Sequence, residues 1–458
     1  MRFSDDEGVT LAHGIGGAKD LPISPELAIA GAVAALAVSF TVLALAWRTP
    51  RYDAATSGRP APAWLTRVVD STWFPALLRV LGFAFFLYVA AAAVFGEDTL
   101  INPIFGVFYV WWWIGIVPLS LLFGPFWKAI SPVRTLNLLF AKATGGDPER
   151  GLYEYPARLG YWPAAVGLFA FVWMELVYPY STELGPVRLW CAVYVAAMLV
   201  GGALFGNRFY QYADPFEVYS TLVGHLSAFG RRPVRRGGKL AKDDGATELV
   251  IRSPLANLDA VPVHPGLVAV VSVLLGSTAF DSYKDSSPWI QFLQSTTIST
   301  YLLNNLAILA FCVILGLGFA GATAATGVSS DQRRDELPNL FAHSMVPIVV
   351  GYIVAHYLNY FIQIGQETLI NLSDPFSTGQ NLLGTANLTV SYWFADHQTL
   401  LASLKVIAVV LGHVVAVVAA HDRAIRLLPR RHQLTGQLPL LFAMVGITAG
   451  GLYLLFAG

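Results

Sequence analysis

Long runs of apolar residues alternate with shorter polar loops along the whole chain. A helix that crosses the hydrocarbon core of a bilayer needs about 20 mostly apolar residues. Backbone groups in lipid must be hydrogen-bonded within the protein, and these runs are continuous rather than alternating, which favours helices over a membrane barrel. The pattern therefore predicts an all-α polytopic transmembrane bundle of ten spans, near residues 27–47, 74–95, 104–126, 161–179, 187–206, 264–282, 300–326, 344–365, 399–420 and 437–457.

The Lys and Arg residues predict the direction of the spans. Cytoplasmic loops of membrane proteins carry an excess of basic residues. If the loop after the first span is cytoplasmic, the inside loops hold 4, 5, 8, 2 and 4 basic residues, which is 23 of the 29 in the chain. These loops are 48–73, 127–160, 207–263, 327–343 and 421–436. We expect an N-out, C-out protein of the cytoplasmic membrane.

Composition narrows the class of protein further. Hydrophobic residues make up 55% of the 458 residues and charged residues only 13%, whereas soluble domains carry about 25% charged residues. A water-soluble globule and a disordered chain are therefore excluded. The 29 basic and 29 acidic residues cancel, so we expect the lipid bilayer, and not nucleic acid, as a partner.

A duplicated pattern covers the second to fifth spans. The motif Phe126-x5-Pro132 follows the third span, and Phe209-x5-Pro215 follows the fifth. In each, Ser or Asp stands directly before the proline, which is typical of a helix N-cap followed by Pro in the first turn. Apolar residues then recur on one face, which predicts two interfacial helices on the cytoplasmic surface. We interpret the pattern as a parallel repeat of two spans plus an interfacial helix.

The chain is expected to divide into two membrane halves. Residues 1–230 would hold the first five spans, and residues 264–458 the other five. Residues 231–263 form a basic cytoplasmic linker between them, and the long polar segment 366–398 is an outer loop. Loops of this length often bind ligands or act as lids.

The eighth span carries a stripe of polar residues. Their spacing of i, i+4, i+7, i+11 and i+15 places them on one helical face. Polar groups inside spans usually face the interior of a bundle. The stripe predicts either an interior site or a helix that is hydrogen-bonded to its neighbours; its members are Tyr352, His356, Asn359, Gln363 and Glu367.

A lysine in the ninth span, Lys405, needs a counter-charge if it stays protonated in the membrane. Glu175 and Asp281 are the candidate partners. With His356, these residues are the four candidate catalytic groups. We expect an outward-facing polar pocket for a small-molecule substrate, lined also by Tyr352, Asn359, Gln363, Asn304 and Asn305.

The candidate cofactor is a divalent metal ion, because imidazoles and carboxylates are ligands that Zn²⁺ accepts. The expected ligands are His356, His397 and Asp396, with His413 and Glu367 as further candidates. Haem held between His356 and His413 is an alternative. The ligand spacings match no established metal motif, and the sequence contains no Walker, HExxH or GxSxG motif.

The N-terminal stretch Leu11-Ala12-His13-Gly14-Ile15-Gly16-Gly17-Ala18-Lys19-Asp20-Leu21-Pro22, followed by the first span, resembles a group of bacterial polytopic membrane proteins. Some members of that group are labelled fenitrothion (organophosphate) hydrolase. The resemblance covers about 35 residues and the general layout, and no site residue can be carried over. It implies hydrolysis of an organophosphate-type ester, assisted by a metal. No apolar signal-peptide core precedes the first span, so we expect the N-terminus to be retained.

Three classes of function follow from the sequence. The first is a membrane-embedded hydrolase, which rests on the resemblance. The second is a proton-coupled transporter of small molecules, because an intramembrane Lys and carboxylates could couple proton movement to a substrate. The third is a non-catalytic subunit that assembles with a membrane protein partner.

Overall fold

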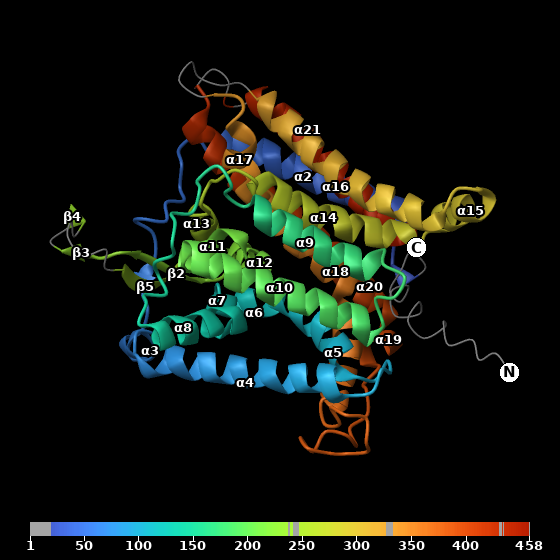
Figure 1. The fold of residues 1–458 in the computed structure, drawn as a ribbon. Coiled ribbons are helices and arrows are strands. Elements are labelled where there is room, and N and C mark those ends of the chain that lie inside the picture. Colours follow the sequence, from blue (N-terminus) through green and yellow to red (C-terminus); the bar gives the residue numbers. More distant parts are fainter. Residues whose placement is uncertain are drawn as a thin grey trace.

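A computed structural model gives the fold of residues 20–236, 239–240, 247–326, 333–429, 433 and 435–457. The part of the resembling N-terminal stretch up to Lys19, including His13, lies outside the described residues, as does part of the basic linker. The chain is an all-α polytopic bundle, as predicted, with its long helices side by side (Figure 1).

Eight helices in the described part of the chain are long and apolar enough to cross a membrane. Two of them are extended by short neighbours, since α17 and η3 lead into α18 and η5 leads into α21. The eight are α2 (Pro25–Ala46), α4 (Trp73–Phe95), α10 (Leu184–Phe205), α14 (Leu267–Lys284), α16 (Thr300–Ala324), α18 (Met345–Asn371), α20 (Gln398–Leu427) and α21 (Leu438–Ala457).

The other two predicted spans are helical but not regular. The span expected near 104–126 is broken into α5 (Pro103–Phe105), the π-helix η2 (Gly106–Trp112) and α6 (Ile116–Phe123), with a bend of 46°. The span expected near 161–179 is α9 (Trp162–Leu176), which has only 15 residues. At 1.5 Å per residue, α9 is shorter than the hydrocarbon core of a bilayer.

Short elements connect these helices. The short helices are α3 (Ala63–Val69), α7 (Trp127–Ile130), α8 (Pro132–Thr144), α11 (Asn207–Ala213), α12 (Pro215–Gly224), α13 (Pro254–Leu258), α15 (Ser287–Ser295), α17 (Leu337–Phe341), η3 (Ala342–Ser344), α19 (Trp393–Asp396) and η5 (Thr435–Gln437). An antiparallel sheet has the order β1 (Arg59–Pro60), β5 (Thr247–Ile251), β2 (Phe229–Pro233), and β3 (Arg235–Arg236) pairs with β4 (Lys239–Leu240).

The predicted helix starts after the two repeated motifs are confirmed. Ser131 caps α8 by accepting a hydrogen bond from the backbone N–H of Arg134 (3.4 Å), and Asp214 caps α12 through Phe216 (3.0 Å). In both helices the residue after the cap is proline, which lacks the N–H that a first-turn position leaves unpaired. The order of two spans, a short helix and a proline-led helix thus occurs twice.

The two repeat units are interlocked. Helix α8 packs on α10 of the second unit, and α12 packs on α6 of the first. A buried ion pair joins α8 to α12, with Arg134 Nη2 2.7 Å from Glu217 Oε1. Arg134 and Glu217 both stand two residues after the motif proline, so equivalent positions of the two units meet.

The prediction of two surface helices needs a correction at α12. Nine of its ten residues are buried, because α6, α7, α9 and α11 enclose it. Helix α8 does lie at the surface, with Leu139 and Phe140 exposed. Its buried face carries polar residues, because Arg134 and Asn137 point to the second unit.

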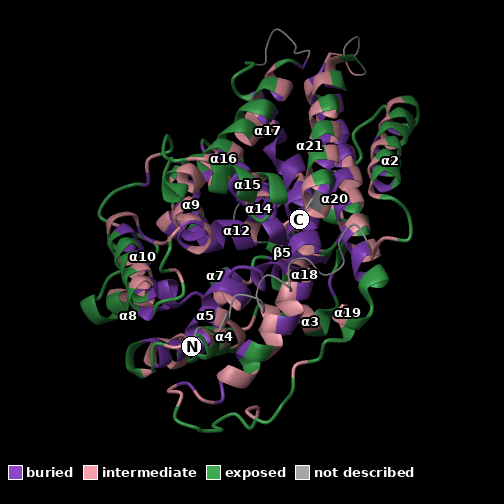
Figure 2. Ribbon diagram, turned by 90° about the vertical axis from the view of Figure 1, so that its right-hand side faces the viewer, coloured by how far each residue is buried: buried purple, intermediate pink, exposed green. Residues whose placement is uncertain are grey.

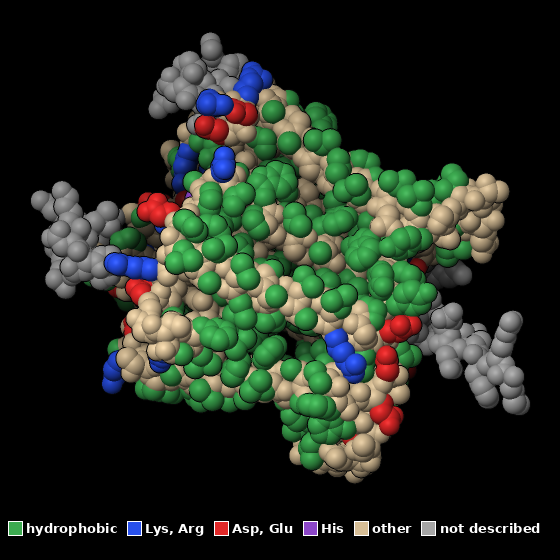
Figure 3. Space-filling view, in the orientation of Figure 1, with side chains coloured by type: hydrophobic (Ala, Val, Ile, Leu, Met, Phe, Trp, Pro, Cys, Tyr) green, Lys and Arg blue, Asp and Glu red, His purple; other side chains and the backbone are tan. Residues whose placement is uncertain are grey.

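Helices α14 and α18 form the centre of the bundle. Both are buried along most of their length, whereas α2, α4, α10 and α16 expose apolar side chains (Figure 2). Exposed apolar helices around a buried centre are what a lipid environment requires. In Figure 3, Lys and Arg side chains gather at the end of the molecule that carries α3 and the β-strands, which we call the basic end.

Candidate functional site

A polar cluster lies between the last turns of α14 and the middle of α18. Asp281 Oδ2 is 2.9 Å from His356 Nε2 and accepts a hydrogen bond from the Tyr357 hydroxyl at 2.6 Å. Lys284 Nζ lies 3.3 Å from the other carboxylate oxygen, Oδ1. The Asp281 side chain is only 2% exposed, so this carboxylate is enclosed by donors and apolar groups. We call these residues, with Ser282 and Tyr352, the α14–α18 cluster.

The cluster continues through the second nitrogen of His356. Ser282 Oγ lies 3.1 Å from His356 Nδ1, and the Tyr352 hydroxyl donates to Ser282 Oγ at 3.2 Å. Tyr352 and His356 are one turn apart on α18, so both reach the same face of α14. The contacts form an unbroken chain of polar atoms from Lys284, at the end of α14, to Tyr352 inside the bundle.

A second carboxylate, Glu175, approaches the cluster from α9. Helix α9 packs against α14, and the charge of Glu175 interacts with Asp281 and Lys284. Its Oε2 is buried and has no hydrogen-bond partner among the described residues. The sequence predicted Glu175 and Asp281 as counter-charges of Lys405; in the structure the two acids lie on packed helices, α9 and α14.

The broken span packs on α18, the central helix that carries His356. Trp111 in η2 donates a hydrogen bond from Nε1 to the carbonyl of Gly365 in α18 (3.1 Å). Gly106 allows the two helices to approach, since a Cβ there would lie 2.0 Å from Thr368 Oγ1. Tyr109 of η2 lies near Glu175. Single π-helical turns occur often at functional sites, and this one borders the polar face of α18.

The predicted stripe on α18 faces the interior over most of its length. Tyr352, His356, Asn359 and Gln363 are buried, whereas Glu367 is exposed. The stripe therefore ends one turn before the outer loop. Asn304 and Asn305 of α16 do not join the α14–α18 cluster by any contact the structure describes; their carbonyl oxygens accept from Trp289 Nε1 (3.1 Å) and Trp173 Nε1 (2.7 Å).

Lys405 lies apart from the two carboxylates expected as its counter-charges. It is 3% exposed on α20, and its charged neighbour is Asp20, just before α2. Asp281 instead contacts Lys284 and His356. Lys284 follows the span predicted near 264–282, so the sequence alone places it in an outer loop.

The predicted metal ligands lie in different parts of the structure, one buried and two exposed. His397 directs Nδ1 to the carbonyl of Trp393 (2.7 Å) in an exposed turn beside Asp396, and its ring stacks on Trp393. His356 is engaged by Asp281 and Ser282. Within the described ranges, three or more His, Cys, Asp or Glu side chains do not gather into a group that could hold a metal ion.

Sequence reasoning missed Ser282, Lys284 and Tyr357. The signal that could have found them is the run Asp281-Ser282-Tyr283-Lys284, which places three polar groups in the last turn of an otherwise apolar helix. Tyr357 gives no such signal, because tyrosine at that position is equally compatible with a lipid-facing side chain.

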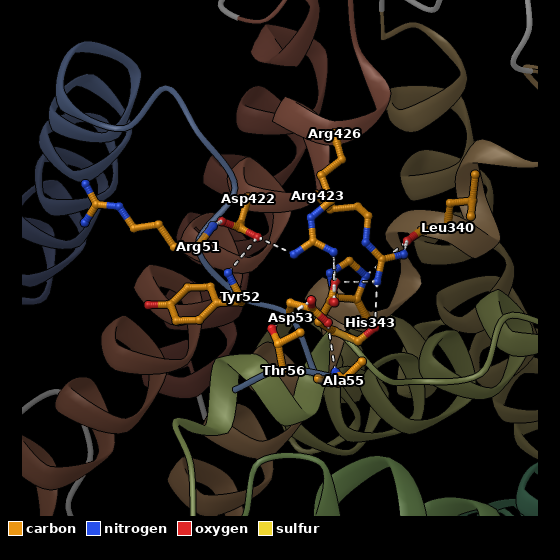
Figure 4. A network of polar contacts seen from close by, with 12 residues as sticks. Arg51, Tyr52, Asp53, Ala55, Thr56, Leu340, His343, Asp422, Arg423 and Arg426 are labelled. Carbon is orange, nitrogen blue, oxygen red and sulfur yellow. Dashed lines mark hydrogen bonds and ion pairs between the residues drawn. The ribbon is translucent and has the colours of Figure 1, made fainter. Parts of the chain in front are cut away.

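A second polar network lies at the basic end (Figure 4). Asp422 of α20 accepts from the backbone N–H of Arg51 at 2.7 Å and pairs with Arg426 at 3.1 Å. Asp259 pairs with Arg426 and Arg423. These contacts tie the segment after α2 and the segment after α13 to the end of α20. Asp422 and Asp259 are paired with Arg side chains and, for Asp422, with a backbone N–H group. This pairing indicates that the network holds the three segments together.

Comparison of the chain with protein-family models, with curated proteins and with solved structures finds no match.

Proposed function

We propose that this multi-pass membrane protein is a proton-coupled transporter of small molecules in which the α14–α18 cluster carries the proton. The observation that supports this is Asp281 inside the bundle, in contact with His356 and Lys284. Ionisable residues are costly in membrane segments and mark ion pathways and proton relays. Here a carboxylate, an imidazole and an ammonium are joined in one chain of contacts.

The chemistry of the pair suits a proton that is bound and released. A proton shared by Asp281 Oδ2 and His356 Nε2 leaves either a neutral pair or an ion pair, and both forms keep the hydrogen bond. Glu175 adds a second carboxylate on α9, the helix that packs against α14. Lys284, with 27% of its side chain exposed, connects the cluster to the end of the bundle opposite the basic end.

The broken span supports movement as well as proton binding. Interrupted helices beside a polar site are common in transporters, where they line the substrate path. Here η2 and α18 pack together next to Tyr109, Tyr360 and Glu175. We propose that loss or gain of the proton shifts α18 relative to the broken span and so changes which side the site faces.

A hydrolase remains the second candidate because His356 lies between Asp281 and Ser282, the contact order of a nucleophilic triad. Ser282 is nevertheless 7% exposed within a regular helix. The backbone N–H groups around it are hydrogen-bonded within α14, so they are not free to stabilise an oxyanion. For that reason we favour transport.

The test uses full-length chain in proteoliposomes under a pH gradient, with a panel of small metabolites and the organophosphate ester paraoxon. We expect at least one compound to drive a proton current that Asp281→Asn abolishes, because an amide cannot exchange a proton with His356. Asp396→Asn is the matched control, since Asp396 is an exposed carboxylate outside the cluster, and it should leave the current unchanged.

The same preparation distinguishes the two candidates. Release of nitrophenol from paraoxon that is lost in Ser282→Ala, without a proton current for any compound, would replace transport by hydrolysis. A proton current that survives Asp281→Asn would also contradict the assignment of the cluster.

A further inference from the structure

Helix α4 carries a cation on an exposed apolar surface. Arg79 is exposed, and the apolar side chains beside it, Leu77, Val80 and Leu81, are exposed as well. Arg79 stands six residues after Trp73, the exposed first residue of α4, which is about 9 Å further along the helix. Trp is typical of the membrane–water interface, so the backbone of Arg79 lies on the hydrocarbon side of that interface.

The Arg79 guanidinium extends back toward the lipid headgroups. The Cα–Cβ bond of a helical residue tilts toward the N-terminus of its helix, and long basic side chains in membrane helices place their charge at the interface. Helix α4 begins beside α3, at the basic end (Figure 1). The charge of Arg79 therefore lies at the level of the headgroups on that side of the membrane.

A second exposed cation, Lys128, lies on α7 next to α4. The two helices approach closely, because a Cβ on Gly82 of α4 would lie 2.3 Å from the carbonyl oxygen of Ile130 in α7. Gly82 follows Arg79 by three residues, and Ile130 follows Lys128 by two, so both cations stand beside this contact. Neither one makes an ion pair or a side-chain hydrogen bond with another residue that the structure describes.

The second repeat unit has neutral residues at the two equivalent positions. Aligned on the proline near the start of α4 and of α9, Arg79 corresponds to Gly167. Aligned on the phenylalanine that opens the repeated motif, Lys128 corresponds to Gln211. Protein occupies the space beside Gly167, since a Cβ there would lie 3.0 Å from Pro215. The cation at this position thus belongs to the unit that is open to its surroundings, which indicates a partner outside the protein.

The membrane supplies an anion that fits these two cations. A charge at the edge of the hydrocarbon region is costly unless it is paired, and Arg binds phosphate groups through its fork of N–H donors. We infer that the contact between α4 and α7 binds an anionic phospholipid, with the phosphate group between Arg79 and Lys128. The acyl chains lie along the exposed apolar side chains of α4, which a free phosphate ion would leave uncovered. This inference does not rest on the proposed transport function.

The test measures lipid binding to the delipidated full chain in detergent by native mass spectrometry, with phosphatidylglycerol and phosphatidylcholine of identical acyl chains. We expect the wild type to bind the first phosphatidylglycerol about fivefold more tightly than phosphatidylcholine. Arg79→Gln and Lys128→Gln should each weaken binding of phosphatidylglycerol about fivefold, because a basic residue near anionic lipid contributes about 1 kcal/mol, where 1.4 kcal/mol is about tenfold. Arg79→Lys keeps the charge and should retain most of the affinity.

Arg208→Gln is the matched control. Arg208 is also an exposed cation, but its helix, α11, packs on α9, α10 and α12, so this variant should bind phosphatidylglycerol like the wild type. Thermal unfolding of Arg79→Gln without added lipid should match the wild type, because the side chain is exposed. Unchanged affinity in Arg79→Gln, an equal loss in Arg208→Gln, or displacement of the lipid by an equal concentration of inorganic phosphate would overturn the inference.

Discussion

Asp214 shows how one residue can serve both as a helix cap and as a buried acid. Its Oδ1 accepts hydrogen bonds from the Tyr194 hydroxyl (2.9 Å) and the Phe216 N–H (3.0 Å), whereas its Oδ2 is buried without a hydrogen-bond partner in the described chain. Burial, and then the charge of Glu217, raise the pKa of Asp214 from its ordinary value of 3.8 to about 7. The cap is therefore most stable in its protonated form.

The stability of the protein should fall as the pH rises from about 4 to about 7. In this window the folded state holds the Asp214 proton and the unfolded state does not, so unfolding releases a proton. At about 1.4 kcal/mol per pKa unit, the full change is of the order of 4 kcal/mol. Thermal unfolding of detergent-purified protein across this range measures it, and the loss should be complete above pH 7.

Asp214→Asn provides the control for that effect. Asparagine is also a good N-cap, and its carbonyl oxygen can accept from both Tyr194 and Phe216. The variant should be more stable than the wild type at pH 7.5 and should lose most of the pH dependence between pH 4 and 7. An unchanged pH dependence would show that another group is responsible.

Single residues of the candidate site were predictable where they broke a helical pattern. His356 and Asn359 are polar residues at regular spacing in an apolar span, and both are buried as expected. The pairing of Asp281 with Lys284 was not predictable, because a lysine at the end of a span usually reaches to the interface. Only the tertiary packing of α14 on α18 shows which charge each residue meets.

Between elements, two glycines mark a close backbone contact that joins α18 to α20. A Cβ on Gly412 would lie 2.5 Å from the carbonyl oxygen of Pro347, and a Cβ on Gly351 would lie 2.4 Å from that of Ala408. Small residues let membrane helices approach in this way, and close packing stabilises them where lipid provides no hydrophobic driving force. Because α18 carries the α14–α18 cluster, this contact also holds the cluster in place.

Gly412→Ala should destabilise the protein by about 1–3 kcal/mol, the usual cost of overpacking. The added methyl group meets a backbone oxygen, which cannot move aside as a flexible side chain can. Gly321→Ala in α16 is the matched control, since nothing lies within 4 Å of its Cβ. Alanine is the better helix former by about 1 kcal/mol, so the control should be neutral or stabilising in the same thermal unfolding assay.

Some features of individual helices could not be predicted from the sequence pattern. Apolar length located all ten helical regions, but it could not show that the third is broken and bent by 46°. Nor could the apolar face of 215–224 show that α12 is enclosed on all sides. Burial on the remaining faces depends on α6 and α7 of the first repeat unit and on α9 and α11, which amphipathic periodicity within one helix does not report.

For the whole molecule, the basic end predicts the orientation in the membrane. Most Lys and Arg side chains visible in Figure 3 lie at that end, and the positive-inside rule predicts that this end faces the cytoplasm. Thr144, at the end of α8, and Ser295, at the end of α15, are exposed and lie at opposite ends of the bundle (Figure 1).

This orientation can be tested with single cysteines in a chain whose Cys191 and Cys312 are replaced by alanine. A membrane-impermeant maleimide should label Ser295→Cys in intact cells and should label Thr144→Cys only after the membrane is opened. The opposite pattern would invert the topology. Labelling of both variants in intact cells would contradict placement of the two sites on opposite sides.

The ion pair between Arg134 and Glu217 has a consequence for how the two repeat units recognise each other. The two residues occupy equivalent positions of the repeated units and meet in the buried contact between them. Two identical units would bring two guanidinium groups, or two carboxylates, face to face at this position, and a buried pair of like charges is strongly unfavourable. A homodimer of the present first unit could not reproduce this contact. The ion pair is therefore specific for the contact between these two different units.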